Sequence, residues 1–190
     1  MNLYIDFDKT LFDSTRFLDK LCSVLDKYNM SRELFTTYNN DFNPYIVLQS
    51  IKKPTFSSKI YDDLNKLFID SSDYVYDDTI PFLKYMKEKG YRIIIVTKGN
   101  REYQEMKIRS SKIDKYCDEI IMTLQDKGNL NLDYKNGIFI DDNPNELLSI
   151  LKNNPKEVIR INRKNNRYNE IKIKEDVKEI TSLGELIREE

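Results

Sequence analysis

The sequence contains no histidine and no tryptophan, and it has only two cysteines in 190 residues. Without histidine the chain cannot use Ser-His-Asp or Cys-His catalysis or a histidine nucleophile, and most zinc and non-haem iron sites are excluded. Cys22 and Cys117 match no metal or redox spacing, and neither is followed six residues later by the arginine of a Cys-x5-Arg phosphatase loop. This cysteine usage is typical of a reduced, cytosolic chain.

Glycine and long apolar runs are also scarce. The spacing of the five glycines excludes both the GxGxxG loop of dinucleotide-binding folds and the GxxxxGK[ST] phosphate-binding loop. The longest aliphatic run, Ile93–Val96, is far too short to span a membrane, and Asp6 brings a charge too early for a signal peptide. We therefore expect a cytoplasmic protein with no membrane contact, whose chemistry uses carboxylates, lysine, hydroxyl groups and an oxygen-bound cation.

Neither sign of charge is in excess. The 31 basic and 32 acidic residues give a formal net charge of -1, so composition favours neither nucleic acid nor an anionic membrane as a partner. Hydrophobic residues make up 39% of the chain, which is enough for a buried core. A length of 190 residues indicates one domain, with room for an inserted subdomain.

The first part of the chain predicts one strand followed by helices. Leu3–Ile5 reads as a short buried strand that ends at Asp6. From Ser14 to about residue 73, apolar residues recur three and four positions apart, and no strand pattern interrupts them. Three residues are candidate helix starts in this region: Ser31, Pro44 and Ser57.

After residue 77, helices and strands alternate. We expect helices at 79–89, 101–112 and 144–153, and strands at 91–97, 119–123, 137–141 and 158–161. Strands separated by helices predict an α/β fold with a doubly wound parallel sheet and right-handed crossovers. The expected organisation is an α/β core of residues 1–13 and 74–190, with an inserted all-helical cap of residues 14–73 over one end of the sheet.

Polar residues stand at the carboxyl ends of three predicted strands, where sheets of this kind bind ligands. The first strand leads into Asp6-Phe7-Asp8-Lys9-Thr10, the second ends at Thr97, and the fourth ends at Asp141-Asp142. Lys127, followed by a glycine, lies between the last two in sequence. A D-x-D-x-T motif alone is a weak signal, but the whole set in this order is much rarer by chance.

Other charged residues near these positions have simpler interpretations. Asp13, Asp77 and Asp78 are expected to cap helices or form turns. Lys9 and Lys98 flank the motif positions, and surface solvation is the better expectation for both.

Two lysines compete for the position before the fourth strand. Lys135 is only six residues before Asp141 and is expected in the turn that leads into the strand. Lys127 is fourteen residues before it and has room for a loop or helical turn, so we prefer Lys127 as the functional lysine.

Four segments of the chain are similar, in order, to the motifs of one family. YIDFDKTLFDS at 4–14 looks like motif I of the haloacid dehalogenase-like (HAD) superfamily, IIIVTKGN at 93–100 like motif II, Lys127 like motif III, and GIFIDDNP at 137–144 like motif IV. The helical segment after motif I resembles the family's C1-type cap. The resemblance implies an aspartyl-phosphate mechanism with Mg²⁺.

The resemblance also discriminates within the family. Haloacid dehalogenases and P-type ATPases lack the second aspartate of motif I, so Asp8 favours a phosphatase or a phosphomutase. One departure is Asn145, which stands where many members carry an acid; Asp142 can supply the second carboxylate.

The residues fit the chemistry of phosphate ester hydrolysis. Asp6 is the candidate nucleophile toward phosphorus. Asp8 is the candidate acid for the leaving oxygen and then the base for water. Thr97 and Lys127 are candidate catalytic residues that bind the phosphoryl group. The candidate Mg²⁺ ligands are Asp6, Asp8, Asp141 and Asp142. Asp8 would bind through its backbone carbonyl.

The predicted function is a Mg²⁺-dependent phosphatase for a small phosphorylated metabolite or nucleotide. A phosphomutase would use the same residues. A nucleic-acid-end phosphatase or a non-catalytic nucleic-acid-binding protein would use residues 152–174, which hold eight basic and two acidic side chains. Residues 175–190 are acidic, and we favour a solvated surface beside an acidic terminal helix.

The predicted cap must contact and recognise the leaving group of the substrate. Five of its residues are polar or aromatic candidates for substrate contact, although a solvated or structural role is the stronger expectation for each: Arg16, Arg32, Tyr38, Tyr45 and Lys52.

Overall fold

The computed structural model describes residues 1–29, 42–50, 58–164, 168, 170–173 and 177–188. Its sheet has six strands, all parallel, in the order β3-β2-β1-β4-β5-β6. The doubly wound parallel α/β fold expected from the sequence is therefore confirmed. The strands are β1 (Asn2–Ile5), β2 (Arg92–Lys98), β3 (Glu119–Thr123), β4 (Gly137–Asp141), β5 (Glu157–Ile161) and β6 (Lys178–Ile180).

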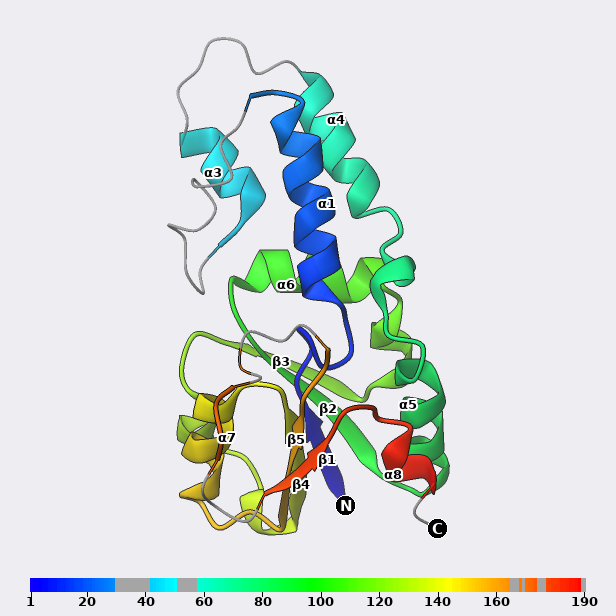
Figure 1. Ribbon diagram of the computed structural model, residues 1–190, viewed down its shortest axis with the longest axis vertical. Coiled ribbons are helices and arrows are strands. Elements are labelled where there is room, and N and C mark those ends of the chain that lie inside the picture. The colour runs from blue at the N-terminus through cyan, green and yellow to red at the C-terminus, as the bar shows by residue number, and fades with distance from the viewer. Residues whose placement is uncertain (30–41, 51–57, 165–167, 169, 174–176, 189–190) are drawn as a thin grey trace.

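Both faces of the sheet are buried, which explains the continuous apolar runs of the central strands. Leu3 and Ile93 belong to the apolar cluster on one face, with side chains of α5 (Thr79–Glu88), α6 (Arg101–Ser110) and α8 (Glu185–Arg188). Tyr4 and Ile94 belong to the cluster on the other face, with side chains of α7 (Pro144–Leu151). Figure 1 shows α7 on one side of the sheet and α5 and α8 on the other.

A helical lobe lies beyond the carboxyl end of the sheet (Figure 1). It contains α1 (Ser14–Asp26), α3 (Pro44–Ser50) and α4 (Ser58–Leu67), and Pro44 is the helix start that the sequence indicates. The other two candidate starts, Ser31 and Ser57, lie outside the described residues. The lobe has an apolar cluster of its own, formed by Leu21, Val24, Leu25, Val47, Leu48, Ile60 and Leu64.

The two connections between lobe and core run side by side. The N–H of Asp13 donates to the carbonyl of Tyr74 at 2.7 Å, and the N–H of Tyr76 donates to the carbonyl of Leu11 at 3.1 Å. An antiparallel bridge pairs Phe12 with Val75 between these bonds. The lobe therefore leaves and rejoins the core at one point.

The carboxyl-terminal region differs from the expectation of an acidic terminal helix. β6 adds a sixth strand beside β5, and only the short α8 follows it. A three-residue strand of sequence Lys-Glu-Ile is too short to show an alternating pattern, so the sequence gives no signal for it. The predicted helix at 101–112 also ends earlier, at Ser110.

The described residues include no helix with the length and apolar character needed to cross a membrane. Cys22 and Cys117, both within the described residues, form no disulfide with each other.

Candidate active site

The aspartates predicted at the strand ends meet where the strand order reverses. β1 and β4 are neighbours at this switch point, and the N–H of Asp6 extends their pairing by donating to the carbonyl of Ile140 at 2.9 Å. Asp6, Asp141 and Asp142 are buried, and one carboxylate oxygen of each lies within 4.8 Å of the others. Carboxylate oxygens are the ligands that Mg²⁺ prefers, so these residues fit that ion.

Lys127 lies inside the acidic cluster. Its Nζ donates to Oδ1 of Asp6 at 2.5 Å and to Oδ2 of Asp141 at 2.6 Å, and its side chain is 4% exposed. Burial lowers the pKa of Lys127, but the charges of Asp141 and Asp6 outweigh it and raise the pKa above its usual value. The ammonium group therefore stays charged at neutral pH.

The acidic cluster carries more negative charge than Lys127 neutralises. Burial raises the pKa of Asp6 well above its ordinary value; Lys127 opposes this, while the charges of Asp141 and Asp142 add to it. Burial also raises the pKa of Asp141, against the charge and hydrogen bond of Lys127. A further cation beside these three carboxylates would relieve both the repulsion and the desolvation cost.

Lys127 lies in a short segment between β3 and β4, and neighbouring residues fix its position. It begins a single 3-10 turn, η3 (Lys127–Asn129), whose carbonyl at Lys127 accepts the Tyr134 hydroxyl at 2.7 Å. The next residue, Gly128, packs against α7: a Cβ there would lie 2.1 Å from the carbonyl oxygen of Ser149. The glycine therefore permits a close approach that brings the lysine to the cluster.

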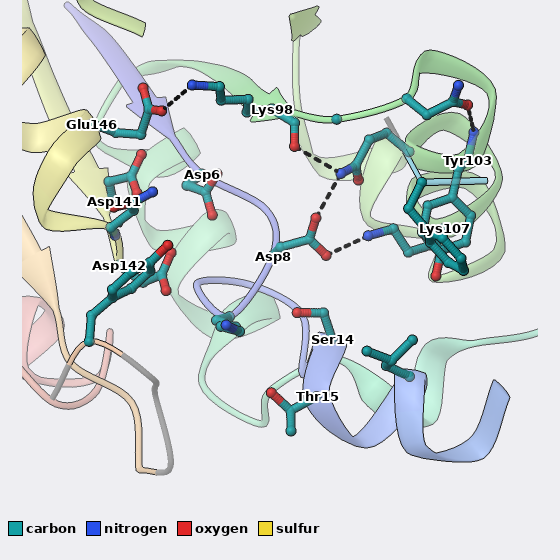
Figure 2. Close-up of a pocket in the computed structure, with 18 of the residues that line it drawn as sticks. Asp6, Asp8, Ser14, Thr15, Lys98, Tyr103, Lys107, Asp141, Asp142 and Glu146 are labelled. Atoms are coloured by element: carbon teal, nitrogen blue, oxygen red, sulfur yellow. Dashed lines mark hydrogen bonds and ion pairs between the residues drawn. The ribbon is translucent and has the colours of Figure 1, made fainter. Parts of the chain in front are cut away.

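Asp8 is placed by a tight turn and points away from the acidic cluster. The N–H groups of Leu11 and Phe12 both donate to the carbonyl of Phe7, and Lys9 has φ +61°. The Asp8 carboxylate accepts Nζ of Lys107 at 2.5 Å and Nε2 of Gln104 at 2.8 Å. Figure 2 shows it facing α6, and its side chain is not among the clustered carboxylates.

Thr97 is fully buried near the end of β2, and its Oγ1 has no hydrogen-bond partner in the structure. Its neighbours Lys98, Gly99 and Asn100 line the cavity described next, but Thr97 itself does not. Its contact with a phosphoryl group stays a prediction.

A cavity of about 860 Å³ opens above the acidic cluster, between the sheet and the helical lobe. The core contributes both acidic pairs and four lysines, Lys9, Lys98, Lys107 and Lys127. Figure 2 shows Ser14 and Thr15 of α1 opposite Asp8. The lobe side of the cavity mixes polar and apolar side chains: Ser14, Thr15, Leu18, Asp19, Cys22 and Phe42.

The simpler interpretations hold for several neighbours of the site. Asp13 caps α1 by accepting the N–H of Arg16 at 3.0 Å. Asp77 lies in an exposed turn, and Lys135 lies exposed in η4 (Tyr134–Asn136), the turn before β4. Lys9 is half-buried, with Nζ 5.7 Å from the centre of the Tyr168 ring, rather than fully solvated.

The expectation for Lys98 is wrong, and that for Asp78, a cap or a turn, holds for its position but not for a side-chain cap bond. Lys98 is not solvated: its side chain is 19% exposed and pairs with Asp126 at 2.5 Å and Glu146 at 2.9 Å, because the buried Glu146 carboxylate needs a cation. Asp78 occupies the N-cap position of α5 but makes no side-chain cap bond. Its carboxylate instead accepts two hydrogen bonds from Arg163, at 2.6 and 2.8 Å.

The basic stretch is not wholly a solvated surface. Arg160 is 2% exposed, pairs with Glu179 at 3.2 Å and donates to the carbonyl groups of Tyr168 and Ile171. Arg163 is 7% exposed and is held by Asp78. Two of the eight cations of this stretch are thus buried and paired with carboxylates, which reduces the charge available to nucleic acid.

The candidate substrate contacts in the lobe do not line the cavity where they are described. Arg16 stacks on Tyr74, with Cζ 5.1 Å from the ring centre, and the Tyr45 hydroxyl donates to Asn65 at 2.7 Å. The remaining three candidates lie outside the described residues: Arg32, Tyr38 and Lys52.

Three polar residues of the site were missed by sequence reasoning. Gln104 and Lys107 are spaced three apart on α6, which the sequence presents as an ordinary amphipathic helix. Glu146, in the first turn of α7, is 4% exposed and accepts the N–H of Lys127 and Nζ of Lys98. Only the apolar residues that follow Glu146 hint that it faces inward.

Comparison with known proteins identifies the architecture. A model of the haloacid dehalogenase-like hydrolases matches residues 4–149, which include the acidic cluster and Lys127. No curated protein sequence matches the chain.

Solved structures share the fold at low sequence identity. A protein assigned to the haloacid dehalogenase-like hydrolases, from Burkholderia xenovorans, has TM-score 0.78 and 16% identity, over 99% of this chain and 95% of that one. A HAD phosphatase from Thermococcus onnurineus has TM-score 0.69 and 20% identity, over 97% and 95%. A protein assigned as a β-phosphoglucomutase, from Thermotoga maritima, has TM-score 0.58 and 16% identity, over 87% and 88%.

Proposed function

We propose that this chain, which belongs to the haloacid dehalogenase-like hydrolases, is a cytoplasmic Mg²⁺-dependent phosphatase that acts on a small phosphorylated substrate through an aspartyl-phosphate intermediate. One observation carries the proposal: three buried carboxylates converge at the switch point of the sheet with Lys127 between two of them. Such a concentration of buried acids is energetically costly unless a further cation completes the site.

Asp6, Asp141 and Asp142 would hold the metal, with the backbone carbonyl of Asp8 beside them. Bound Mg²⁺ supplies positive charge against the oxygens of the phosphoryl group. A carboxylate of Asp6 attacks phosphorus, so that an Asp6 oxygen–phosphorus bond forms while the bond to the ester oxygen breaks. Lys127 offsets the negative charge of the transferred group and keeps Asp6 in place.

Asp8 moves the proton in both halves of the reaction. It gives its proton to the leaving oxygen, so that the product departs as a neutral hydroxyl compound. In the second half it takes a proton from a water molecule that attacks phosphorus, and the bond to Asp6 breaks. Asp6 and Asp8 then return to their starting states, and inorganic phosphate is released.

The helical lobe is proposed as the cap of this site. It faces the acidic cluster across the cavity, and Leu18 and Phe42 give that wall apolar surface. A wall of this kind excludes water from the aspartyl-phosphate and contacts the leaving group. In this proposal, residues 14–73 form the cap and residues 1–13 and 74–190 form the core.

The test measures phosphate release from p-nitrophenyl phosphate and from a panel of phosphorylated sugars and nucleotides, with Mg²⁺ and with chelator. Asp6→Asn, which keeps the size of the side chain, should lower turnover more than about 1,000-fold. Asp26→Asn, at an exposed position at the end of α1, is the matched control. Full activity of Asp6→Asn would refute the mechanism.

A second measurement addresses the intermediate directly. Enzyme mixed with substrate labelled in its phosphate and quenched in acid should retain label on the peptide that contains Asp6. Wild-type turnover without any retained label under single-turnover conditions would argue for direct attack by water. Formation of an isomerised sugar phosphate in place of free phosphate would instead identify a phosphomutase.

A further inference from the structure

We propose that Lys107 and Gln104 of α6 are positioning residues for Asp8: they fix its carboxylate in the orientation from which it exchanges a proton with the leaving oxygen. The inference rests on the proposed function, because only a phosphoryl-transfer reaction gives Asp8 a proton to deliver. It assigns a role to two residues that belong to no motif of the sequence.

The contacts account for both oxygens of the Asp8 carboxylate. Nζ of Lys107 donates to Oδ1 at 2.5 Å, and Nε2 of Gln104 donates to Oδ2 at 2.8 Å. Two bonds to different oxygens fix the plane of the carboxylate as well as its position (Figure 2). Asp8 lies beyond the end of β1 and directly before a turn, so its backbone is less restrained than that of Asp6, which extends the pairing of β1 with β4.

Lys107 is itself immobilised. Its side chain is 4% exposed, and Nζ lies 4.8 Å from the centre of the Tyr103 ring and 5.6 Å from that of the Phe7 ring. The ammonium group of a buried lysine beside two rings has less freedom to move toward a substrate than that of a surface lysine. Its described contacts are therefore suited to orienting Asp8.

The contacts of Gln104 independently support its role as a positioning residue for Asp8. Its Nε2 also donates to the carbonyl of Lys98 at 3.3 Å, so the amide is tied to the end of β2. Its Oε1 is buried without a hydrogen-bond partner in the structure, which is an unfavourable state for an amide oxygen. An apolar residue would avoid that cost, so the bond to Asp8 is the feature that explains a glutamine here.

The test compares two substrates of nearly the same shape. Phenyl phosphate releases a phenol with a pKa near 10 and needs a proton on its leaving oxygen, whereas p-nitrophenyl phosphate releases a far more acidic phenol. The value of kcat/KM covers the steps up to release of the phenol. The ratio of the two kcat/KM values, each at the pH of the variant's maximal rate, therefore reports on proton delivery alone.

Gln104→Met and Lys107→Met should each lower kcat/KM for phenyl phosphate about 10-fold or more, with less than about a threefold loss for p-nitrophenyl phosphate. Asp8→Asn should change the ratio in the same direction, and adding Lys107→Met to it should change the ratio no further. Lys107→Arg should recover part of the loss. Lys87→Met, which breaks the surface ion pair with Asp118, is the control and should leave the ratio unchanged.

An equal loss with both substrates, or no loss with either, would overturn the inference, because a purely structural role affects both reactions alike. Thermal unfolding identifies a variant that is not folded. If Lys107→Met is not folded, Gln104→Met, which removes no charge, decides the question. Turnover by the wild type that disappears in Asp6→Asn establishes the proposed function separately, so failure of the two ideas can be told apart.

Discussion

The carboxylate of Glu146 accepts the backbone N–H of Lys127 at 2.7 Å. Through this bond the first turn of α7 holds the short segment that carries the buried lysine. The same carboxylate binds Nζ of Lys98 at 2.9 Å, so one acid joins the end of β2 to the lysine of the site. The position of Lys127 thus depends on its backbone neighbours as much as on the aspartates that it contacts.

Gly128→Ala should displace that segment. The new methyl group would lie 2.1 Å from the carbonyl oxygen of Ser149, which is backbone and cannot move away cheaply. We expect a loss of about 1–3 kcal/mol in the free energy of unfolding and a lower kcat, measured by urea denaturation and phosphate release. Gly184→Ala is the control, since its methyl group would meet only the Ser182 hydroxyl, at 3.2 Å. Equal effects of the two substitutions would contradict the expectation.

Lys127→Met should make the free energy of unfolding depend strongly on Mg²⁺. Removing the ammonium leaves three buried carboxylates without their internal cation, which should cost about 3–5 kcal/mol in chelator. Added Mg²⁺ should stabilise the variant by binding to the folded state, while activity stays low because the charge facing the phosphoryl group is lost. Unfolding with and without Mg²⁺ checks this, with the exposed Lys135→Met as control. A variant as stable as the wild type in chelator would show that the lysine is not needed to balance the acids.

Thr97→Val should separate folding from activity. The buried Oγ1 has no partner, so replacing the hydroxyl by a methyl group should change stability by less than about 1 kcal/mol or increase it. If the hydroxyl donates to the phosphoryl group, kcat/KM should fall about 10-fold or more, the size of a lost hydrogen bond to a charged group. Thermal unfolding and kcat/KM for p-nitrophenyl phosphate measure the two effects, and unchanged kcat/KM would remove Thr97 from the site.

Asp78 should make the fold sensitive to acid. Burial raises the pKa of Asp78, but the hydrogen bonds of Arg163 and Ser182, the Arg163 charge and the N–H of Leu183 outweigh it, so the pKa lies below its usual value. A carboxyl whose pKa is lower in the folded state stabilises the fold above the pKa of the unfolded chain, near 4. This contribution is lost as the pH falls through the lowered pKa.

We therefore expect Asp78→Asn to cost about 2 kcal/mol at pH 7 and progressively less below pH 4. Urea denaturation at pH 7 and pH 3 measures the difference, and the exposed Asp26→Asn should change stability little at either pH. A cost of Asp78→Asn that does not shrink in acid would show that the Arg163 pair is not the stabilising interaction.

The sequence predicts the central part of the fold well because its strands are buried on both faces. Runs such as Ile93–Val96 have few alternatives, and the placement of Asp6 and Asp141 after such runs predicts that they meet. Spacing alone predicts Lys127 as the functional lysine, since the turn that carries it must fit between β3 and β4. The sequence does not predict β6, because an edge strand of three residues is too short to show an alternating pattern.

The residues that sequence reasoning missed are fixed by packing between distant elements. Lys107 reaches Asp8 only because α6 crosses back over the end of β1, and nothing in the helix pattern distinguishes it from a solvated lysine. Lys98 and Arg163 are similar: each is a common surface residue type that the tertiary fold places beside a buried acid.

The pairing of Phe12 with Val75 means that everything between these two residues begins and ends at one place. A segment with such adjacent ends can be shortened, lengthened or exchanged for that of a relative at little cost in loop-closure entropy, because the core holds both junctions together. The strand ends that carry Asp6 and Asp141 lie outside this segment. Chimeras joined at residues 13 and 74 should therefore keep the chemistry of the site and change the choice of leaving group.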